Sequence, residues 1–245
     1  MSPNKRLDDA IRQAGWSPGE LAAKLGVDPK TVERWISTGR IPHPRLRGQT
    51  SSFLDVPAAL LWPDAGGSMD GMGELAGIYR TRTELSPATV RSMLVAAERQ
   101  IDVLAYSALW LWDSVPGFAA TVAGKAAAGV SVRLCLGDPD SPAVRVRGEE
   151  EGIGETMAAR CRLAATYAEP IAAVDPALVR YSGATLYASI LRFDDDVLLN
   201  VHLWGNAAAE SPVMYFNRRD EDGLAANAIK SFEKVWADAQ PSSTG

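Results

Sequence analysis

Residues 17–44 read SPGELAAKLGVDPKTVERWISTGRIPHP and contain two helix-start signals. The first is Ser17, followed at once by a proline and, at the third helical position, by Glu20, the arrangement of a capping box. Gly26 ends that helix, and Asp28 with the proline after it begins another. The stretch therefore predicts two short helices joined by a turn that contains glycine.

The second of these helices has two unlike faces. Val32, Trp35 and Ile36 recur at helical spacing and predict a buried side. The positions between them are polar or charged: Lys30, Thr31, Glu33 and Arg34. Two short helices whose second member keeps a polar face free form a helix-turn-helix, and that second helix fits the major groove of DNA.

The sequence around this stretch predicts a small helical domain. Residues 5–15 have apolar positions at helical spacing and stop at a glycine, and residues 54–61 are expected to form a closing helix. Residues 1–50 contain nine Lys and Arg against five Asp and Glu, a net charge of +4 in a chain whose total is -5. A basic segment on an acidic body is typical of a DNA-binding domain joined to a domain with another task.

The residues quoted above resemble the Xre-type, lambda-repressor-like regulators, whose pattern passes through LA and LGV to a TVxRW helix and then G-R-x-P. Ile36 departs from the Glu that many members carry. The resemblance implies a DNA interface in which Arg34 reaches a guanine edge and Lys30 a phosphate, with later cations in a proline-broken loop that clamps the backbone. The alternative is that these charges form a solvated face. The candidate DNA-binding residues are Ser17, Lys30, Thr31, Arg34, Arg40, His43, Arg45 and Arg47.

Beyond residues 1–63, a Gly- and Met-containing stretch at 64–74 is expected to be a linker, and residues 75–240 a second domain. Its segments alternate: 90–100 helical, 101–112 with strand character, a helix that ends at Gly129, and a strand from 131. This order predicts an α/β domain with a mixed, partly parallel sheet and ligand loops at the carboxyl ends of its strands. One long helix is expected over about 149–168.

Residues 185–204, TLYASILRFDDDVLLNVHLW, predict a hairpin that turns at three aspartates, and residues 224–239 a closing amphipathic helix. This order resembles one copy of the phospholipase D-like fold. The same chain is also similar to actinobacterial regulators in which an Xre-type head precedes a domain with YASILRFDDD and HLxG stretches. The fold class that follows is an all-α helix-turn-helix head and an α/β phospholipase D-like domain.

Phospholipase D-like enzymes carry HxKxxxxD, in which His attacks phosphorus and Lys holds the phosphate. On that motif His202 keeps the first position, Trp204 replaces the Lys, and Ala209 replaces the Asp, with Glu210 one step late. Losing one preorganised donor costs about a hundredfold to a thousandfold in rate. We therefore expect a protein that is not an enzyme. The alternative is a phosphodiesterase or nuclease that pairs two copies.

The degenerate motif can survive as a ligand pocket at the strand ends, and its candidate residues are Tyr106, Ser107, Trp110, Asp138, His202 and Trp204. The alternative is that these aromatic residues belong to the core. The expected partners are double-stranded DNA, a possible small-molecule effector and a second copy of the chain as a homodimer. A module that only dimerises, or one that docks another protein, remains open for this domain.

Several classes of site and location are not expected. No apolar run of membrane-spanning length and no signal peptide is present, so the sequence predicts a cytoplasmic protein. Cys135 and Cys161 lie in apolar surroundings and predict buried thiols. We expect no cofactor and no metal site, since the acidic residues 194–196 are typical of a solvated hairpin tip.

Overall fold

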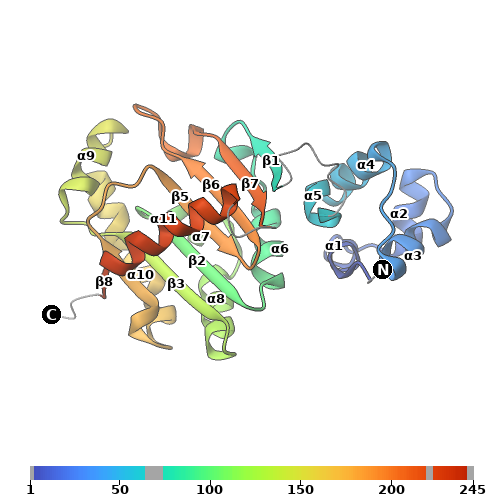
Figure 1. The fold of residues 1–245 in the computed structure, drawn as a ribbon, viewed down its shortest axis with the longest axis horizontal. Coiled ribbons are helices and arrows are strands. Elements are labelled where there is room, and N and C mark those ends of the chain that lie inside the picture. The colour runs from blue at the N-terminus through green and yellow to red at the C-terminus, as the bar shows by residue number, and fades with distance from the viewer. Residues whose placement is uncertain (1–2, 64–73, 219–222, 242–245) are drawn as a thin grey trace. The chain divides into compact units, whose positions relative to one another are not determined.

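The computed structural model describes residues 3–63, 74–218 and 223–241 (Figure 1). The chain divides into two compact units, Met1–Gly77 and Ile78–Gly245. The predicted linker at 64–74 lies outside the described residues except for Glu74. None of the helices in the described ranges combines the length and the apolar character that a membrane crossing requires.

The first unit is helical. Its elements are α1 (Lys5–Gln13), α2 (Pro18–Leu25), α3 (Pro29–Thr38), α4 (Pro44–Leu54) and α5 (Ala58–Leu61). Ser17 and Glu20 form the capping box of α2, and Asp28 caps α3 by accepting a hydrogen bond from the backbone N–H of Lys30. The two helices are joined by residues 26–28, with Gly26 in the left-handed conformation that a side chain disfavours. The helices and the turn lie where the sequence predicts them.

Apolar side chains from all five helices form the core of this unit. Val32 and Trp35, predicted to be buried, are 0% and 3% exposed, and the Trp35 ring meets the edge of Trp62 at 6.0 Å between centroids. Aromatic edge-to-face contacts of this kind add to the free energy gained by burial. Because this side of α3 is buried, its polar side faces solvent.

Two predictions for the end of this unit are wrong. Residues 44–54 form a helix, so Arg45 and Arg47 lie on α4 and not in a loop. The predicted closing helix over 54–61 is interrupted, because Asp55 takes a left-handed backbone conformation with φ 52° that ends α4 before α5 begins. Aspartate tolerates this conformation better than most residues.

The second unit combines helices with a sheet. Its strands are β1 (Leu75–Tyr79), β2 (Gln100–Ala105), β3 (Ser131–Gly137), β4 (Val179–Ser182), β5 (Ala188–Phe193), β6 (Asp196–Val201), β7 (Val213–Asn217) and β8 (Gln240–Pro241). Its helices are α6 (Pro87–Ala96), α7 (Leu109–Ser114), α8 (Phe118–Ala127), α9 (Pro142–Glu150), α10 (Thr156–Ala172) and α11 (Leu224–Asp238). Short 3-10 helices are η2 (Arg82–Glu84), η3 (Pro176–Leu178) and η4 (Ala208–Glu210).

Over the described residues the strands form one sheet in the order β1-β7-β6-β5-β2-β3-β4-β8. β2, β3 and β4 are parallel, and each connection between them passes through helices. β5 pairs antiparallel with β2 and β6, and β6 pairs antiparallel with β7. The fold class predicted from the sequence, a helical head followed by an α/β domain with a mixed, partly parallel sheet, is confirmed.

Helices cover both faces of the sheet (Figure 1). α11, red in the figure, crosses one face, and α6, α8 and α10 pack on the other. Asp102 of β2 is 1% exposed and faces α11, where Arg133 of β3 donates to both of its carboxylate oxygens at 2.7 and 3.0 Å. The same guanidinium donates to Glu233 of α11 at 2.7 Å and lies over the Phe232 ring. A fully paired buried charge thus fixes α11 to the sheet.

Two helical segments differ from the prediction. The strand expected over 101–112 ends at Ala105, because Ala108 adopts a left-handed φ of 52° and the following apolar residues form α7. The long helix expected over about 149–168 is two helices, α9 and α10. Gly152 and Gly154 both have positive φ in the turn between them.

The hairpin at the three aspartates is confirmed, and each of its three carboxylates forms hydrogen bonds or an ion pair with other protein groups. Asp194, at φ 55°, accepts hydrogen bonds from the backbone N–H groups of residues 98–100 at 2.8–2.9 Å. Burial by itself raises the pKa of this carboxyl, but the three N–H groups together lower it. Asp195 pairs with Arg99, and Asp196 accepts bonds from two side chains of β7. Within the described residues no group of three or more His, Cys, Asp or Glu side chains is placed to hold a metal ion.

Candidate ligand cavity and nucleic-acid interface

A cavity of about 430 Å³ lies at the carboxyl end of β2, on the face of the sheet that α10 covers. Its floor comes from the adjoining ends of three neighbouring strands, β2, β5 and β6, and its walls come from α7, α10 and η4. Antiparallel pairing brings the start of β5 beside the end of β2, and the end of β6 beside the start of β5. The register of these strand pairs therefore places the residues of the cavity floor next to one another.

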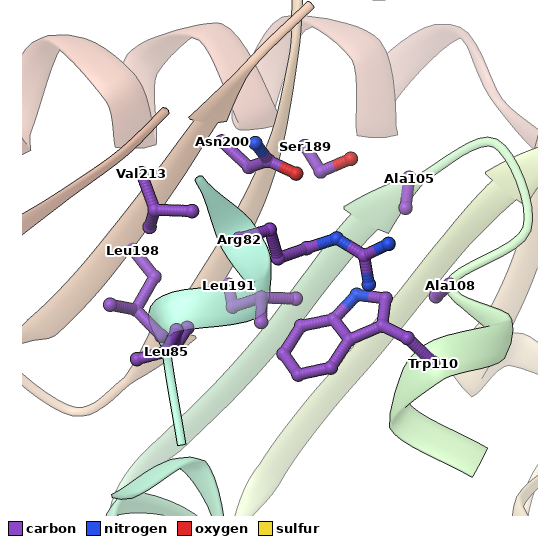
Figure 2. A pocket seen from close by; sticks show the side chains of 10 residues that line it. All are labelled: Arg82, Leu85, Ala105, Ala108, Trp110, Ser189, Leu191, Leu198, Asn200 and Val213. Atoms are coloured by element: carbon purple, nitrogen blue, oxygen red, sulfur yellow. The ribbon is translucent and has the colours of Figure 1, made fainter. Parts of the chain in front are cut away.

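Arg82 enters this cavity from η2 (Figure 2). Its side chain crosses the sheet above an apolar floor and its guanidinium lies over the Trp110 ring at 4.9 Å from the centroid. Burial lowers the pKa of Arg82 to about 10, with Glu151 opposing this change and Arg160 adding to it. The guanidinium remains charged at neutral pH in a partly desolvated site, where its interaction with an anion is stronger than in water.

His202 is held by two hydrogen bonds at the cavity floor. Its Nδ1 donates to the carbonyl of Leu186 at 2.9 Å, since a carbonyl only accepts, and its Nε2 lies 3.0 Å from the Ser189 hydroxyl. The pKa of His202 is lowered to about 4, mainly by burial; the hydrogen bond to the Leu186 carbonyl opposes this change and the nearby Arg147 contributes to it. The ring is therefore neutral at pH 7, and its Nε2 accepts a hydrogen bond from the Ser189 hydroxyl.

Tyr106 supports the histidine. Its ring stacks on His202 with centroids 5.6 Å apart, and its hydroxyl accepts a hydrogen bond from the backbone N–H of Leu186 at 3.0 Å. Gly137 makes room for this ring, because a Cβ there would come within 3.1 Å of Tyr106 Cδ1. Burial raises the pKa of Tyr106, so its hydroxyl stays protonated. The glycine at the end of β3 is thus a packing requirement of the site.

Two polar side chains from opposed strands complete the floor. Ser189 of β5 and Asn200 of β6 face each other directly in the antiparallel register, so their side chains point to the same side of the sheet. Asn200 is 6% exposed, and its Nδ2 donates to the carbonyls of Ser211 and Pro212 at 3.2 and 3.1 Å. Its Oδ1 is buried and has no hydrogen-bond partner among the described residues.

The structure brings four of the six predicted pocket residues together and leaves two apart. Tyr106, Ser107, Trp110 and His202 line the cavity. Asp138 instead caps the turn after β3, where its carboxylate accepts the backbone N–H of Asp140 at 3.0 Å. Trp204 is 79% exposed and is not among the described residues that line the cavity.

Sequence reasoning missed the residues that carry most of the polar character of this cavity: Arg82, Glu151, Arg160, Ser189 and Asn200. Ser189 and Asn200 lie inside the quoted hairpin, and the alternation of the two strands would have put them on one face. No local pattern marks Arg82, which lies in a short 3-10 helix far from the hairpin in sequence.

The two cysteines are not among the described residues that line the cavity. Both are buried with free thiols, as predicted, and burial raises the pKa of each to about 12. The Cys161 thiol donates to the Tyr106 carbonyl at 3.2 Å. Protonated buried thiols are unreactive at neutral pH.

The first unit has a groove of about 280 Å³ between α3 and α4. Polar side chains on its walls are Thr31, Arg34, Arg40 and His43, and apolar ones are Trp35, Ile41, Pro42 and Leu46. Lys30, Arg34, Arg40 and Arg45 are exposed, whereas Arg47 is half-buried. His43 also caps α4, since its Nδ1 accepts the N–H of Arg45 at 3.3 Å. Of the predicted DNA-binding residues, Thr31, Arg34, Arg40 and His43 line this groove, whereas Lys30, Arg45 and Arg47 are not among its described lining residues.

Ser17 has a different place from the other predicted DNA-binding residues. Its hydroxyl donates to Glu20 Oε2 at 2.8 Å and accepts the Glu20 N–H at 3.3 Å, while its own N–H donates to the same carboxylate at 2.7 Å. These bonds account for a structural role at the start of α2.

Comparison with known proteins gives only distant likeness. No protein-family model and no curated protein matches the chain. Among solved structures it is similar to TrmBL2, described as an archaeal chromatin protein with a novel mode of DNA binding: 13% identity, TM-score 0.41, covering 80% of this chain and 64% of that one. It is also similar to phosphatidylserine synthase of Haemophilus influenzae Rd KW20: 13% identity, TM-score 0.41, covering 67% of this chain and 38% of that one. This chain thus spans less than two thirds of the length of each of these two structures.

Proposed function

We propose that this chain is a sequence-specific DNA-binding transcription regulator whose second unit binds a small ligand, mediates dimerisation, or does both. The observation that carries the proposal is the α3–α4 groove, where exposed cations border a helix whose other side is locked into the core. The second unit supports a sensor because its cavity contains polar groups whose hydrogen-bonding capacity is not used within the described residues.

The arrangement of charge in the first unit supports DNA as the partner. Arg34 lies on the exposed side of α3, so its planar guanidinium is free to donate two hydrogen bonds to a guanine edge. Lys30 lies in the first turn of the same helix, where a cation suits a phosphate. Arg40 lines the groove before α4 begins, and Arg45 lies exposed in the first turn of α4. Both add exposed positive charge to the first unit, which suits contacts to DNA phosphates.

Pairing of two copies is supported by a separate feature of the second unit. The side chains of Tyr187 and Trp204 are 83% and 79% exposed. The two segments that carry them are neighbours, since the backbone N–H of His202 donates to the Tyr187 carbonyl at 2.8 Å. Exposed aromatic side chains on neighbouring segments are typical of an interaction surface. A dimer would place two helix-turn-helix units on successive half-sites.

Mobility-shift assays at fixed salt, on a site selected from random DNA, test the proposal. Arg34→Ala should weaken specific binding by about 1–3 kcal/mol and relax the sequence preference, whereas Lys30→Ala should weaken all sequences more evenly. The matched control is Arg12→Ala, which removes an exposed arginine from α1. Equal binding by wild type and both α3 variants, or failure to select any site, would contradict a DNA-binding role for α3.

The second candidate is a phosphodiesterase, favoured by the presence of His202 beside two arginines in the cavity. Two observations argue against it. The lone pair on His202 Nε2 is engaged by a hydrogen bond from the Ser189 hydroxyl. Trp204, at the motif position of the phosphate-holding lysine, is exposed to solvent. We expect no turnover of nucleic acid, phospholipid or a chromogenic diester, with or without divalent cations. Turnover in the wild type that disappears in His202→Ala would establish the enzyme instead.

A further inference from the structure

Two arginines line the cavity without a carboxylate partner. Arg82 of η2 and Arg160 of α10 both contribute to its wall, and neither forms an ion pair within the described residues. Arg82 Nε is buried and has no hydrogen-bond partner there. Burial is the main cause that lowers the pKa of Arg82; Glu151 opposes this change and the positive charge of Arg160 adds to it. A bound anion would relieve the repulsion between the two positive charges.

The acidic groups of the cavity form no ion pair with Arg82 or Arg160 within the described residues. Glu151 forms an ion pair with the buried Arg147 at 2.6 Å, and Arg147 also pairs with Glu150 at 3.2 Å. Asp113 is exposed. The Arg82 side chain thus extends into a partly desolvated space where Glu151, already paired with Arg147, acts on it without forming an ion pair.

The floor opposite the arginines offers hydrogen-bond acceptors. In the part of the chain that the structure describes, Asn200 Oδ1 is buried without a partner, and Ser189 Oγ, which donates a hydrogen bond to His202, keeps its lone pairs as acceptors. Because the two residues are directly opposed across β5 and β6, their side chains lie next to each other on the cavity face of the sheet (Figure 2). A buried acceptor left without a donor is costly, and the hydroxyl groups of a ligand would supply the donors.

We infer that this cavity binds a small organic anion that carries hydroxyl groups. The anionic group lies between Arg82 and Arg160, the hydroxyl groups donate to Asn200 Oδ1 and Ser189 Oγ, and the carbon chain lies against the Trp110 ring. A carboxylate and a phosphate share this chemistry. The inference rests on the proposed ligand-binding role of the second unit and names the class of ligand.

Isothermal titration calorimetry of the full chain with four probes of matched chain length tests this assignment. Gluconate and sorbitol 6-phosphate carry both an anion and hydroxyl groups, sorbitol carries only the hydroxyl groups, and adipate carries only the anions. We expect at least one of the first two to bind with a Kd of about 1 mM or tighter, and sorbitol and adipate to bind at least about tenfold more weakly. The better of the first two identifies the anion as carboxylate or phosphate.

Three variants locate the bound probe. Arg82→Gln should weaken binding of the better probe by about tenfold or more, because a charge-assisted hydrogen bond in a desolvated site is lost. Arg160→Gln should weaken it by about threefold, since this arginine is exposed. The control is Arg162→Gln on the same helix, which removes an exposed arginine that pairs with Asp140 at 2.8 Å outside the cavity, and it should bind like the wild type.

Four results would overturn the inference: no heat with any probe, sorbitol or adipate binding as tightly as the hydroxylated anions, unchanged affinity in Arg82→Gln and Arg160→Gln, or an equal loss in Arg162→Gln. Arg160→Gln keeps the test decisive if Arg82→Gln does not fold, because its side chain is exposed. Titration requires no DNA. An anion that binds through these arginines without altering the mobility shift would therefore refute regulation by ligand and leave the ligand class standing.

Discussion

His202 and Trp204 are two residues apart and have opposite surroundings. Backbone and side-chain bonds fix the imidazole at the cavity floor, whereas the indole is 79% exposed. The sequence motif treats both as pocket residues because it counts positions along the chain. After β6 ends at Val201, the direction of each side chain depends on the turn that follows and not on strand alternation.

The buried histidine predicts a pH dependence of stability. The pKa of His202 is about 4 in the folded protein, against an ordinary value of 6.5, mainly because burial disfavours the charged ring. The unfolded chain therefore binds a proton below pH 6.5 that the folded chain does not bind until about pH 4. The free energy of unfolding of the second unit should fall as the pH decreases across this window.

Chemical denaturation at a series of pH values measures this effect. The His202→Gln variant, which has no titrating ring at this position, should show a smaller decrease between pH 6.5 and 4 than the wild type. Identical slopes in the two proteins would show that His202 is not buried as a neutral group.

At the scale of secondary-structure elements, side-chain capping bonds determine where α2 and α3 of the first unit begin. The Ser17–Glu20 box begins α2, and Asp28 begins α3, each through hydrogen bonds to backbone N–H groups that a helix leaves unpaired. The hydrogen bonds to Ser17 also lower the pKa of Glu20. The exposed face of α3 depends on these ends, because they fix where each helix starts.

Replacement of Ser17 separates its cap from a DNA contact. Ser17→Ala should lower the free energy of unfolding of the first unit by about 1 kcal/mol, and Ser17→Thr should retain most of it, since threonine also caps. Denaturation followed by circular dichroism measures the change. Unaltered stability together with weaker DNA binding would instead make Ser17 a direct contact.

The junction of α9 and α10 requires a glycine at one position. A Cβ on Gly148 would lie 2.2 Å from the carbonyl oxygen of Gly154, a backbone atom that cannot move aside without shifting the turn. Gly148→Ala should therefore destabilise the second unit by about 1–3 kcal/mol or more.

A second glycine provides the control for this variant. Gly124 lies inside α8 with no atom within 4 Å of the position of a Cβ. Gly124→Ala should stabilise by up to about 1 kcal/mol through helix propensity. Thermal unfolding of the two variants compares them directly, and equal behaviour would refute the close approach at Gly148.

At the scale of the whole molecule, charge is divided unevenly along the chain. The total is -5, yet residues 1–50 have a net charge of +4. Contacts to DNA phosphates depend on local cations and on the counterions that they displace, so a net negative protein can still bind DNA through a basic surface.

Salt dependence is the measurable consequence of this division. The logarithm of the DNA association constant should fall linearly with the logarithm of salt concentration, and Arg45→Gln should reduce the magnitude of the slope by about 0.9, the value for one lost phosphate contact. The same measurement on Arg145→Gln, an exposed arginine of α9 in the acidic second unit, should leave the slope unchanged. An equal change in both variants would argue against a binding surface confined to the first unit.

The sequence by itself determined the helix-turn-helix, the mixed α/β class of the second unit and the hairpin at the aspartates. Caps, glycine turns and the period of apolar residues act between neighbours in the chain, so they can be recognised without knowledge of the fold. The same local signals failed where a left-handed backbone interrupted an apolar run, at Asp55 and at Ala108.

Only the tertiary structure decided which side chains share the cavity. Arg82, Trp110, Ser189 and Asn200 come from four separate segments and meet because β2, β5 and β6 pair in one register. A shift of that register by a single residue would turn Ser189 and Asn200 to the opposite face of the sheet. The sequence alone could not establish that register, because it follows from the packing of the whole sheet against its helices.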